Sequence, residues 1–259
     1  MPRLPPRPNL SWTDAGAPRA DDYSDIYFSG DGLSETRAVF LDGCNLPGAW
    51  ASAETFTVGE LGFGSGLNLL ALWRLWRDHR PSPSARLHFL SFEGFLMEPE
   101  DAARIHAAHP ELSEISQHLL ARWPVHARGV QRIQLPDGVT LTIHIDEISA
   151  ALPEAEASCD AWFLDGFAPA RNPDMWSAEA MRHVARLSQP GAVAATYTVA
   201  GEVRRNLAAA GFTVEKKPGH GTKRERLEAR LPGAPPAPNP PRTIAIIGAG
   251  IAGAGAAQA

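Results

Sequence analysis

The residues best suited to chemistry lie where short apolar runs end, and the first group is the segment GELGFGSGLN, residues 59–68. Its glycines allow a sharp turn and a close approach of the backbone to a ligand. Its acid, Glu60, is unsuited to an anionic pyrophosphate and suits a ligand with a cationic amino-acid end. The segment therefore favours S-adenosylmethionine over a dinucleotide, with a plain glycine turn as the alternative. The expected cofactor residues here are Glu60, Gly62, Phe63, Gly64, Gly66 and Asn68.

Two further acidic residues stand at the ends of later apolar runs. Glu93 ends the run FLSFE, and Asp146 ends TLTIHID. An acid after the second strand of a nucleotide-binding sheet can accept hydrogen bonds from both ribose hydroxyls of an adenosine, so we expect Glu93 in that role. Asp146 is placed to reach the adenine amino group. The alternatives are a solvated loop acid for Glu93 and a helix N-cap for Asp146, but acids at three successive strand ends indicate one common ligand.

A fourth acid, Asp165, follows the apolar run AWFL and begins the loop DGFAPARNPDMW. Methyl transfer is a displacement in which the enzyme mainly positions and desolvates an uncharged nucleophile. A carboxylate can hold an amine nucleophile by a hydrogen bond and accept its proton. We therefore predict Asp165 to be the catalytic residue, with a structural turn as the alternative.

The charge of the chain is uneven. The whole chain carries −5, which excludes a generic polyanion binder, whereas residues 201–231 carry +4. A local basic segment on an acidic protein indicates a directed contact with phosphate. Lys223 and Arg224 follow a glycine-rich turn and are candidates for binding RNA phosphate. A solvated basic hairpin is an equally good interpretation of the same residues.

Composition excludes several other classes of protein. The 259 residues are 44% hydrophobic and 20% charged, which is ordinary for a globular protein. The two cysteines, Cys44 and Cys159, are far apart and form no disulfide framework, and no metal-ligand spacing is present. No apolar run approaches the roughly 20 residues of a membrane helix. The N-terminus has no signal-peptide core, so a cytoplasmic location is expected.

The hydrophobic pattern predicts alternating strands and helices, which would position the candidate residues. The predicted strands are 56–61, 86–92, 140–145, 161–164, 192–197, 212–216 and 226–231, and the predicted helices are 67–77, 98–108, 111–121, 174–187 and 202–210. For the helix at 174–187, Asn172 is the expected cap and Pro173 lies in the first turn. The alternation predicts an α/β fold, a Rossmann-like, mostly parallel sheet with helices on both faces. The last two strands predict an antiparallel hairpin at one edge, and ligands of such sheets bind beyond the carboxyl ends of the strands.

Proline-rich segments divide the chain. Residues 1–8 are expected to be an irregular arm and residues 9–231 the main domain. Residues 232–242 contain six prolines, which indicates a semi-rigid linker. In residues 243–259 a strand leads into Gly248, Gly250 and Gly253, a dinucleotide-binding fingerprint. No second strand follows, so we expect this to be the first turn of a flavin- or nicotinamide-binding domain that the chain lacks.

The segment 21–50 precedes the first predicted strand of the sheet and is rich in aromatic and polar residues. It is expected either to cover the cofactor pocket through Tyr27 and Phe28 or simply to pack against the sheet.

Taken together, these motifs resemble the N-terminal methyltransferase half of the bifunctional tRNA 5-methylaminomethyl-2-thiouridine biosynthesis proteins. The similar segments are YSDIYFS, VFLDGCNLP, GELGFGSGLN, SFEGF, FLDGFAPARNPDMW and GHGTKRERL, which together extend over nearly the whole chain. The resemblance implies S-adenosylmethionine-dependent methylation of the exocyclic amine of 5-aminomethyl-2-thiouridine at the tRNA wobble position. In that family an oxidoreductase domain that uses FAD follows in the same chain, which fits the linker and the glycine fingerprint.

The resemblance also implies roles for the individual residues. Asp165 would be the active-site carboxylate, Lys223 and Arg224 would face tRNA, and Glu60, Gly62, Gly64, Gly66, Glu93 and Asp146 would line the cofactor site. The sequence departs from the family at Gly94, where a basic residue is expected. Two alternatives remain open. An aminopropyltransferase of the spermidine synthase type shares the fold and the acidic strand ends, and a non-catalytic RNA-binding module would keep the fold as a scaffold.

Overall fold

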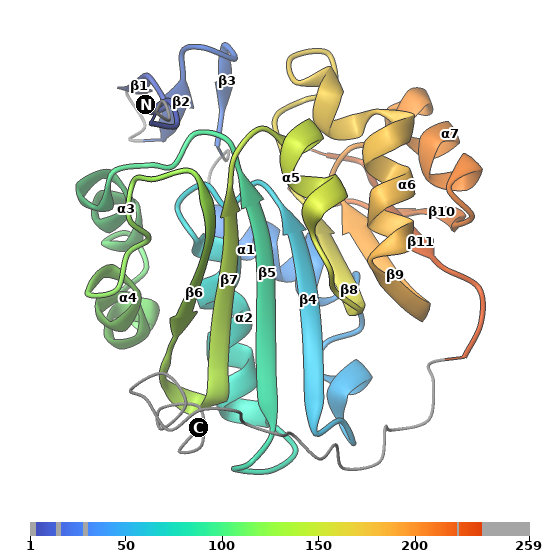
Figure 1. The fold of residues 1–259 in the computed structure, drawn as a ribbon, viewed down its shortest axis with the longest axis horizontal. Helices are drawn as coiled ribbons and strands as arrows, with labels where there is room; N and C mark the ends of the chain where they lie inside the picture. Colours follow the sequence, from blue (N-terminus) through green and yellow to red (C-terminus); the bar gives the residue numbers. More distant parts are fainter. Residues whose placement is uncertain (1–3, 14–16, 28–30, 222, 235–259) are drawn as a thin grey trace, which may run out of the picture.

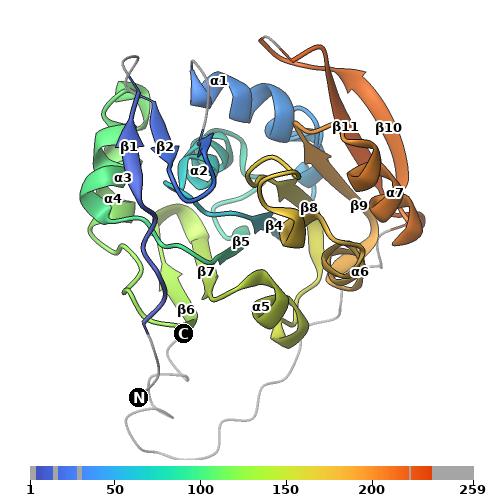
Figure 2. The same ribbon diagram turned by 90° about the horizontal axis from the view of Figure 1, so that it is seen from above.

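The computed structural model describes residues 4–13, 17–27, 31–221 and 223–234. Gly248, Gly250 and Gly253 of the predicted fingerprint therefore lie outside the described residues, as do Phe28 and most of the proline-rich linker. The predicted α/β fold is confirmed, because a central sheet of eight strands is covered by helices on both faces (Figures 1 and 2).

The strand order of the central sheet is β10-β11-β9-β8-β4-β5-β7-β6. Its strands are β4 (Thr55–Leu61), β5 (Arg86–Glu93), β6 (Gly129–Gln134), β7 (Val139–Ile145), β8 (Cys159–Leu164), β9 (Ser188–Thr196), β10 (Thr213–Pro218) and β11 (Glu225–Arg230). The five inner strands from β9 to β7 are parallel. Strand β4, the first of them in the chain, pairs with β5 on one side and β8 on the other. A ligand crevice is expected at the carboxyl end of such a switch point.

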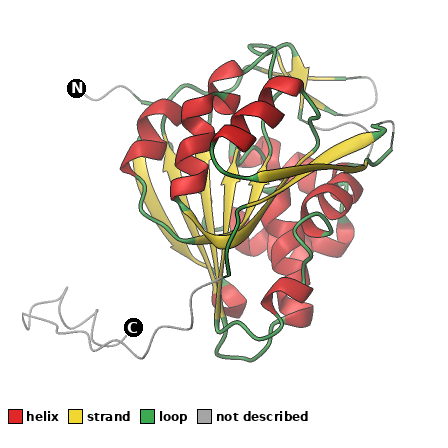
Figure 3. Ribbon diagram, turned by 90° about the vertical axis from the view of Figure 1, so that its right-hand side faces the viewer, coloured by secondary structure: helices red, strands yellow, loops and turns green. Residues whose placement is uncertain are grey.

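The helices pack in two groups on the two faces of the sheet (Figure 3). They are α1 (Gly32–Thr36), α2 (Leu67–His79), α3 (Pro99–His106), α4 (Ser113–Leu120), α5 (Ile148–Glu154), α6 (Ala178–Arg186) and α7 (Gly201–Ala209). Helix α2 packs against Val58 and Phe89, whereas α5, α6 and α7 pack against Leu90 and Trp162 on the other face. Successive strand residues point to opposite faces, so two buried faces explain the continuous apolar runs. Within the described part of the chain, no helix has the length and apolar character needed to cross a membrane.

The edges of the sheet agree only partly with the sequence prediction. The antiparallel hairpin of β10 and β11 is confirmed at one edge. The opposite edge is β6, which pairs antiparallel with β7 and was not predicted. Its sequence, GVQRIQ, lacks a buried face, and Val130 is 60% exposed. A strand without a buried face leaves little hydrophobic pattern to detect.

The predicted helix at 174–187 is wrong in its first turn. Pro173–Trp176 forms a separate 3₁₀ turn, and Asn172 makes no capping hydrogen bond through its side chain. Helix α6 begins after Ser177, whose hydroxyl accepts a hydrogen bond from the backbone amide of Ala180. Proline in a first turn is compatible with either helix type, and serine is as good a capping residue as asparagine.

A second, three-stranded antiparallel sheet precedes the main one in the chain. It consists of β1 (Leu10–Trp12), β2 (Pro18–Ala20) and β3 (Asp25–Ile26) and lies above α3 (Figure 1). Leu10 and Trp12 pack on the buried cluster that contains Ile105 of α3. The guanidinium of Arg104 lies 3.7 Å from the ring centroid of Trp12. Strands of two or three residues have too little periodicity to be predicted from sequence.

Candidate functional site

A cavity of about 490 Å³ lies beyond the carboxyl ends of the parallel strands. Its size is typical of small-molecule sites, which range from about 300 to 1,000 Å³. The sequence-predicted residues that line it are Gly62, Phe63, Gly64, Asn68, Glu93, Asp165 and Lys223. The fold therefore brings most of the predicted site to one place.

The turn between β4 and α2 requires its glycines. Gly62, Gly64 and Gly66 have φ of +89°, +53° and +74°, a region that side chains disfavour. A Cβ on Gly62 would also lie 2.2 Å from the backbone oxygen of Asp165. The turn thus packs directly on the loop after β8, which joins the predicted cofactor residues to the predicted catalytic residue.

Glu93, at the end of β5, holds this turn in place. Its carboxylate accepts hydrogen bonds from the backbone amides of Gly64, at 2.9 Å, and Phe95, at 2.7 Å. Burial raises the pKa of Glu93 above its ordinary value. The carboxylate also lines the cavity, so its remaining lone pairs can accept the ribose hydroxyls predicted for it.

Asp146 does not line the cavity, contrary to the sequence prediction. Its carboxylate pairs with the side chain of Arg128 and accepts a hydrogen bond from the backbone amide of Glu147 at 2.9 Å. The cavity is lined instead by the next two residues, Glu147 and Ile148. These two are the better candidates for contact with an adenine on this side.

Glu60 is also not on the cavity surface. It is completely buried, and its carboxyl group accepts hydrogen bonds from the Ser91 hydroxyl at 2.6 Å and from Asn68 Nδ2 at 3.0 Å. Burial raises its pKa well above the ordinary value. Glu60, which was predicted to line the cofactor site, thus lies against Asn68 and not on the cavity surface.

Asn68, the second residue of α2, connects Glu60 to Asp165. Its Nδ2 also donates a hydrogen bond to Asp165 Oδ2 at 2.7 Å, and its Oδ1 accepts one from the Thr36 hydroxyl at 2.7 Å. The amide therefore has partners for both ends, which fixes its orientation. This arrangement holds the carboxylate of Asp165 in one position at the cavity wall.

Burial raises the pKa of Asp165 to about 7. The hydrogen bond from Asn68 lowers this pKa, the charge of Glu35 raises it, and the charge of Lys223 lowers it, each by less than burial does. A carboxylate with a pKa near neutrality can both accept and release a proton under physiological conditions. The site thus contains a carboxylate whose position and pKa suit general base chemistry.

Aromatic side chains form the outer wall of the cavity. The rings of Tyr23 and Phe167 stack at 4.7 Å between centroids, and Tyr27 meets Phe167 edge-on at 5.1 Å. Burial and nearby acids raise the pKa of Tyr23 to about 12. Asp25 of β3 accepts a hydrogen bond from the backbone amide of Ala168 at 2.9 Å, which ties the small sheet to the loop after β8.

Lys223 and Arg224 are neighbours in sequence but lie in different environments in the structure. The Lys223 ammonium pairs with Glu35, lies 3.9 Å from the ring centroid of Tyr197, and lines the cavity. Arg224 is exposed and is not among the residues that line the cavity. The hydroxyl of Tyr197 donates a hydrogen bond to the backbone oxygen of Gly166, which anchors the loop after Asp165.

The sequence prediction missed Asp25, Glu35, Thr36 and Tyr197, all of which line the cavity. Three of them precede the first strand of the main sheet, and their partners lie far along the chain. No local spacing connects such residues. The signal that could have drawn attention to Tyr197 is its position after β9, the next parallel strand beyond β8.

Comparisons with known proteins agree with this geometry. Residues 110–232 match a family model described as S-adenosyl-L-methionine-dependent methyltransferase. The chain is 53% identical over 252 residues to the tRNA 5-methylaminomethyl-2-thiouridine biosynthesis bifunctional protein MnmC of Caulobacter vibrioides and 52% identical over 250 residues to that of Maricaulis maris. These matches cover 96% and 95% of the chain.

The chain spans 42% and 43% of the length of these two relatives. Among solved structures, the crystal structure of MNMC2 from Aquifex aeolicus matches with a TM-score of 0.66 and 23% sequence identity. That match covers 90% of this chain and 73% of the other, and at this identity it supports the fold.

Proposed function

We propose that the chain is an S-adenosyl-L-methionine-dependent methyltransferase that methylates the exocyclic amine of 5-aminomethyl-2-thiouridine at the wobble position of tRNA, giving 5-methylaminomethyl-2-thiouridine. The observation that supports this most directly is Asp165, a half-buried carboxyl group at the wall of the cavity that is held by a 2.7 Å hydrogen bond from Asn68 and whose pKa is raised to about 7. An alkylammonium becomes a nucleophile only after it loses a proton, which a general base can accept, and the names of the relatives specify 5-methylaminomethyl-2-thiouridine.

The cavity residues fit S-adenosylmethionine. The positive-φ turn at Gly62 and Gly64 brings the backbone to the cavity, and Glu93 offers a carboxylate to the ribose. Phe63, Glu147 and Ile148 would enclose the nucleoside. When bound, S-adenosylmethionine would supply an electrophilic methyl group to the amine lone pair, and its sulfur would keep the electron pair of the carbon–sulfur bond as the leaving group.

The residues of the chain would prepare the amine for this displacement. Asp165 accepts the proton that the substrate ammonium must lose, because only the neutral amine has a free lone pair. Asn68 keeps the carboxylate directed into the cavity through its 2.7 Å hydrogen bond. The wall of Tyr23, Tyr27 and Phe167 excludes water from the reacting pair.

The wider context is also part of the proposal. The glycine fingerprint at residues 248–253 supports a FAD-binding oxidoreductase domain in the same protein, as the word bifunctional in the relatives' names implies. A soluble tRNA substrate supports a cytoplasmic location. The basic segment 201–231 supports contact with tRNA, with Arg224 exposed next to the cavity residue Lys223.

The test is a transfer assay with the full chain, labelled S-adenosylmethionine and tRNA that carries 5-aminomethyl-2-thiouridine. We expect one methyl group per modified wobble base and no transfer to tRNA with an unmodified wobble uridine. Binding of S-adenosylmethionine without transfer to this tRNA would contradict the proposal. Preferential binding of decarboxylated S-adenosylmethionine would instead favour an aminopropyltransferase, and tRNA binding without cofactor binding would favour an RNA-binding module.

A further inference from the structure

The cavity contains a cation that the protein itself supplies. Lys223, in the turn between β10 and β11, directs its ammonium onto Glu35 of α1 and over the ring of Tyr197, 3.9 Å from the centroid. All three residues line the cavity. The Glu35 side chain is 17% exposed and that of Lys223 is 36% exposed, so the carboxylate lies deeper than the residue that neutralises it.

One carboxylate and one aromatic face are sufficient to bind an ammonium group. The carboxylate provides a charge-assisted hydrogen bond, and the ring face provides a cation–π interaction that strengthens as water is excluded. Neither contact recognises anything particular to lysine. The same two groups would bind any primary alkylammonium that reaches them.

This ammonium position lies in the same cavity as the proposed general base. Glu35 and Lys223 both interact electrostatically with Asp165, with opposite effects on its pKa. Tyr197 is joined to the loop of Asp165 through its hydrogen bond to Gly166. A cation at this position therefore shares the cavity with the carboxylate to which it would lose a proton, and its charge acts on that carboxylate.

We propose that Glu35 and Tyr197 form the binding site for the aminomethyl cation of the substrate, and that Lys223 occupies this site until the substrate displaces it. The inference rests on the proposed function. The lysine ammonium and the aminomethyl group are both primary ammonium groups on a methylene stem, so one can replace the other without loss of charge balance.

The displacement also gives Lys223 its second role. Gly221, two residues before Lys223, has φ of +59°, and Arg224 beside it is exposed. Once released from Glu35, the lysine is free to contact a phosphate of the incoming RNA. The sequence prediction of a phosphate contact and the observed contact with Glu35 then describe two states of one side chain.

The test measures binding of the free nucleoside 5-aminomethyl-2-thiouridine, which has no phosphate, to the full chain in the presence of S-adenosylhomocysteine. Isothermal titration calorimetry compares the wild type with Lys223→Met. Because a competitor for the site has been removed, we expect the variant to bind the nucleoside about tenfold more tightly. The same variant should bind tRNA carrying this nucleoside several-fold more weakly, because it has lost a phosphate contact, on the order of one counterion.

Three further variants make the result specific. Lys223→Arg retains a cation for Glu35 and should bind the nucleoside about as the wild type does. Glu35→Gln should weaken nucleoside binding, with thermal melting as the check that it is folded. Lys216→Met is the matched control, because Lys216 lies on the same hairpin, is exposed and pairs with Glu225 at 2.7 Å, away from the cavity. Its affinity for the nucleoside should not change.

Equal or weaker nucleoside binding by Lys223→Met would overturn the inference, and so would undetectable binding by both proteins. Failure of the proposed function gives a different pattern, because the wild type would then transfer no methyl group to aminomethylated tRNA, whatever the lysine variants bind. The two outcomes are therefore distinguishable.

Discussion

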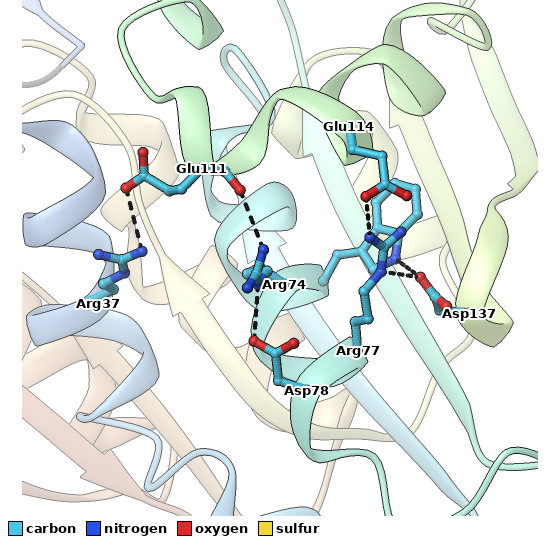
Figure 4. Close-up of polar contacts among 8 residues, drawn as sticks. Arg37, Arg74, Arg77, Asp78, Glu111, Glu114 and Asp137 are labelled. Carbon is cyan, nitrogen blue, oxygen red and sulfur yellow. Dashed lines mark hydrogen bonds and ion pairs between the residues drawn. The ribbon is translucent and has the colours of Figure 1, made fainter.

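Acidic side chains contact helix α2 near both of its ends, and their pKa values are shifted in opposite directions at the two ends. At its beginning, Glu60 and Asp165 receive hydrogen bonds from the neutral amide of Asn68, and burial raises the pKa of both acids. At its end, Asp137 accepts hydrogen bonds from Trp73 at 2.9 Å and Arg77 at 2.7 Å, and these bonds lower its pKa (Figure 4).

The two environments suit different roles: the acid at the end of α2 stabilises the fold, and the acids at its beginning suit chemistry. Arg77 also pairs with Glu114 of α4 at 3.0 Å, so the end of α2 is joined to its neighbours by charge (Figure 4). Acids paired in this way favour the folded state while they are ionised. Acids that are buried without a compensating cation cost stability in their ionised form and gain basicity, which is useful only at a reacting centre.

The largest effect should come from Asp165→Asn. The amide is nearly isosteric and can still accept the hydrogen bond from Asn68, but it cannot take a proton from the substrate amine. We expect methyl transfer to fall by about 10²–10⁴-fold with little change in cofactor affinity or melting temperature. Single-turnover transfer, calorimetric binding of S-adenosylmethionine and thermal melting measure these three quantities.

The pH profile of the wild type is the control for this interpretation. A base with a pKa raised to about 7 is protonated below that pH, so the transfer rate should rise through about pH 7 as Asp165 ionises. Asn68→Ala removes a hydrogen bond that favours the ionised form and should move this rise to higher pH. A profile that is the same in wild type and Asp165→Asn would exclude Asp165 as the base.

An opposite pattern is expected at the other end of the helix. Asp137→Ala leaves the buried Trp73 indole N–H without its acceptor and leaves Arg77 with Glu114 alone, at a cost of about 2–3 kcal/mol in the free energy of unfolding. Urea unfolding at neutral pH measures the loss. Transfer activity of the folded fraction should be unchanged, because Asp137 lies away from the cavity.

Asp137→Asn is the matched control for that loss. Asp137 has φ of +60°, which asparagine tolerates far better than alanine, and the amide keeps one acceptor oxygen. Its unfolding free energy should therefore lie between those of the wild type and the alanine variant. Because the pKa of Asp137 is lowered in the folded state, its stabilisation is present above the unfolded pKa and is lost as the pH falls. Wild type and Asp137→Ala that remain equally far apart at acidic pH would contradict the role given to this carboxylate.

The sequence predicted the fold wherever elements bury a face. The parallel strands, α2 and the β10–β11 hairpin were predicted because their apolar residues meet the sheet. Strand β6 was missed because its side chains are largely exposed. The 3₁₀ turn Pro173–Trp176 was predicted to be the first turn of the helix that follows it, because Pro173 suits either helix type. Exposed or very short elements are determined by neighbours that the local sequence does not contain.

The candidate site was predictable to a similar extent. Acids at strand ends were found because position along a strand is a local property, and Glu93 and Asp165 do line the cavity. Glu60 was assigned to the cavity although it lies beneath it, because a sequence shows that an acid ends a strand and not how deep it lies. Glu35 and Tyr197 were missed because only the folded topology brings them to Lys223.

The smallest effect, and the most direct comparison of the two ends of α2, should come from Glu60→Gln. The folded-state pKa of Glu60 is raised, so its contribution to stability is fully present below the unfolded pKa, about 4.3, and declines as the pH rises toward the folded pKa. Glutamine does not titrate, so the variant should gain stability relative to the wild type as the pH rises from 5 to 6. Urea unfolding at the two pH values measures this gain. The difference between wild type and Asp137→Asn should stay nearly constant over the same interval, because both pH values lie above the unfolded pKa of an aspartate, about 3.9, and Asp137 is ionised in both states. Parallel pH dependence of wild type and Glu60→Gln would mean that Glu60 is ionised beneath the cavity, and the contrast between the two ends of the helix would then rest on Asp165 alone.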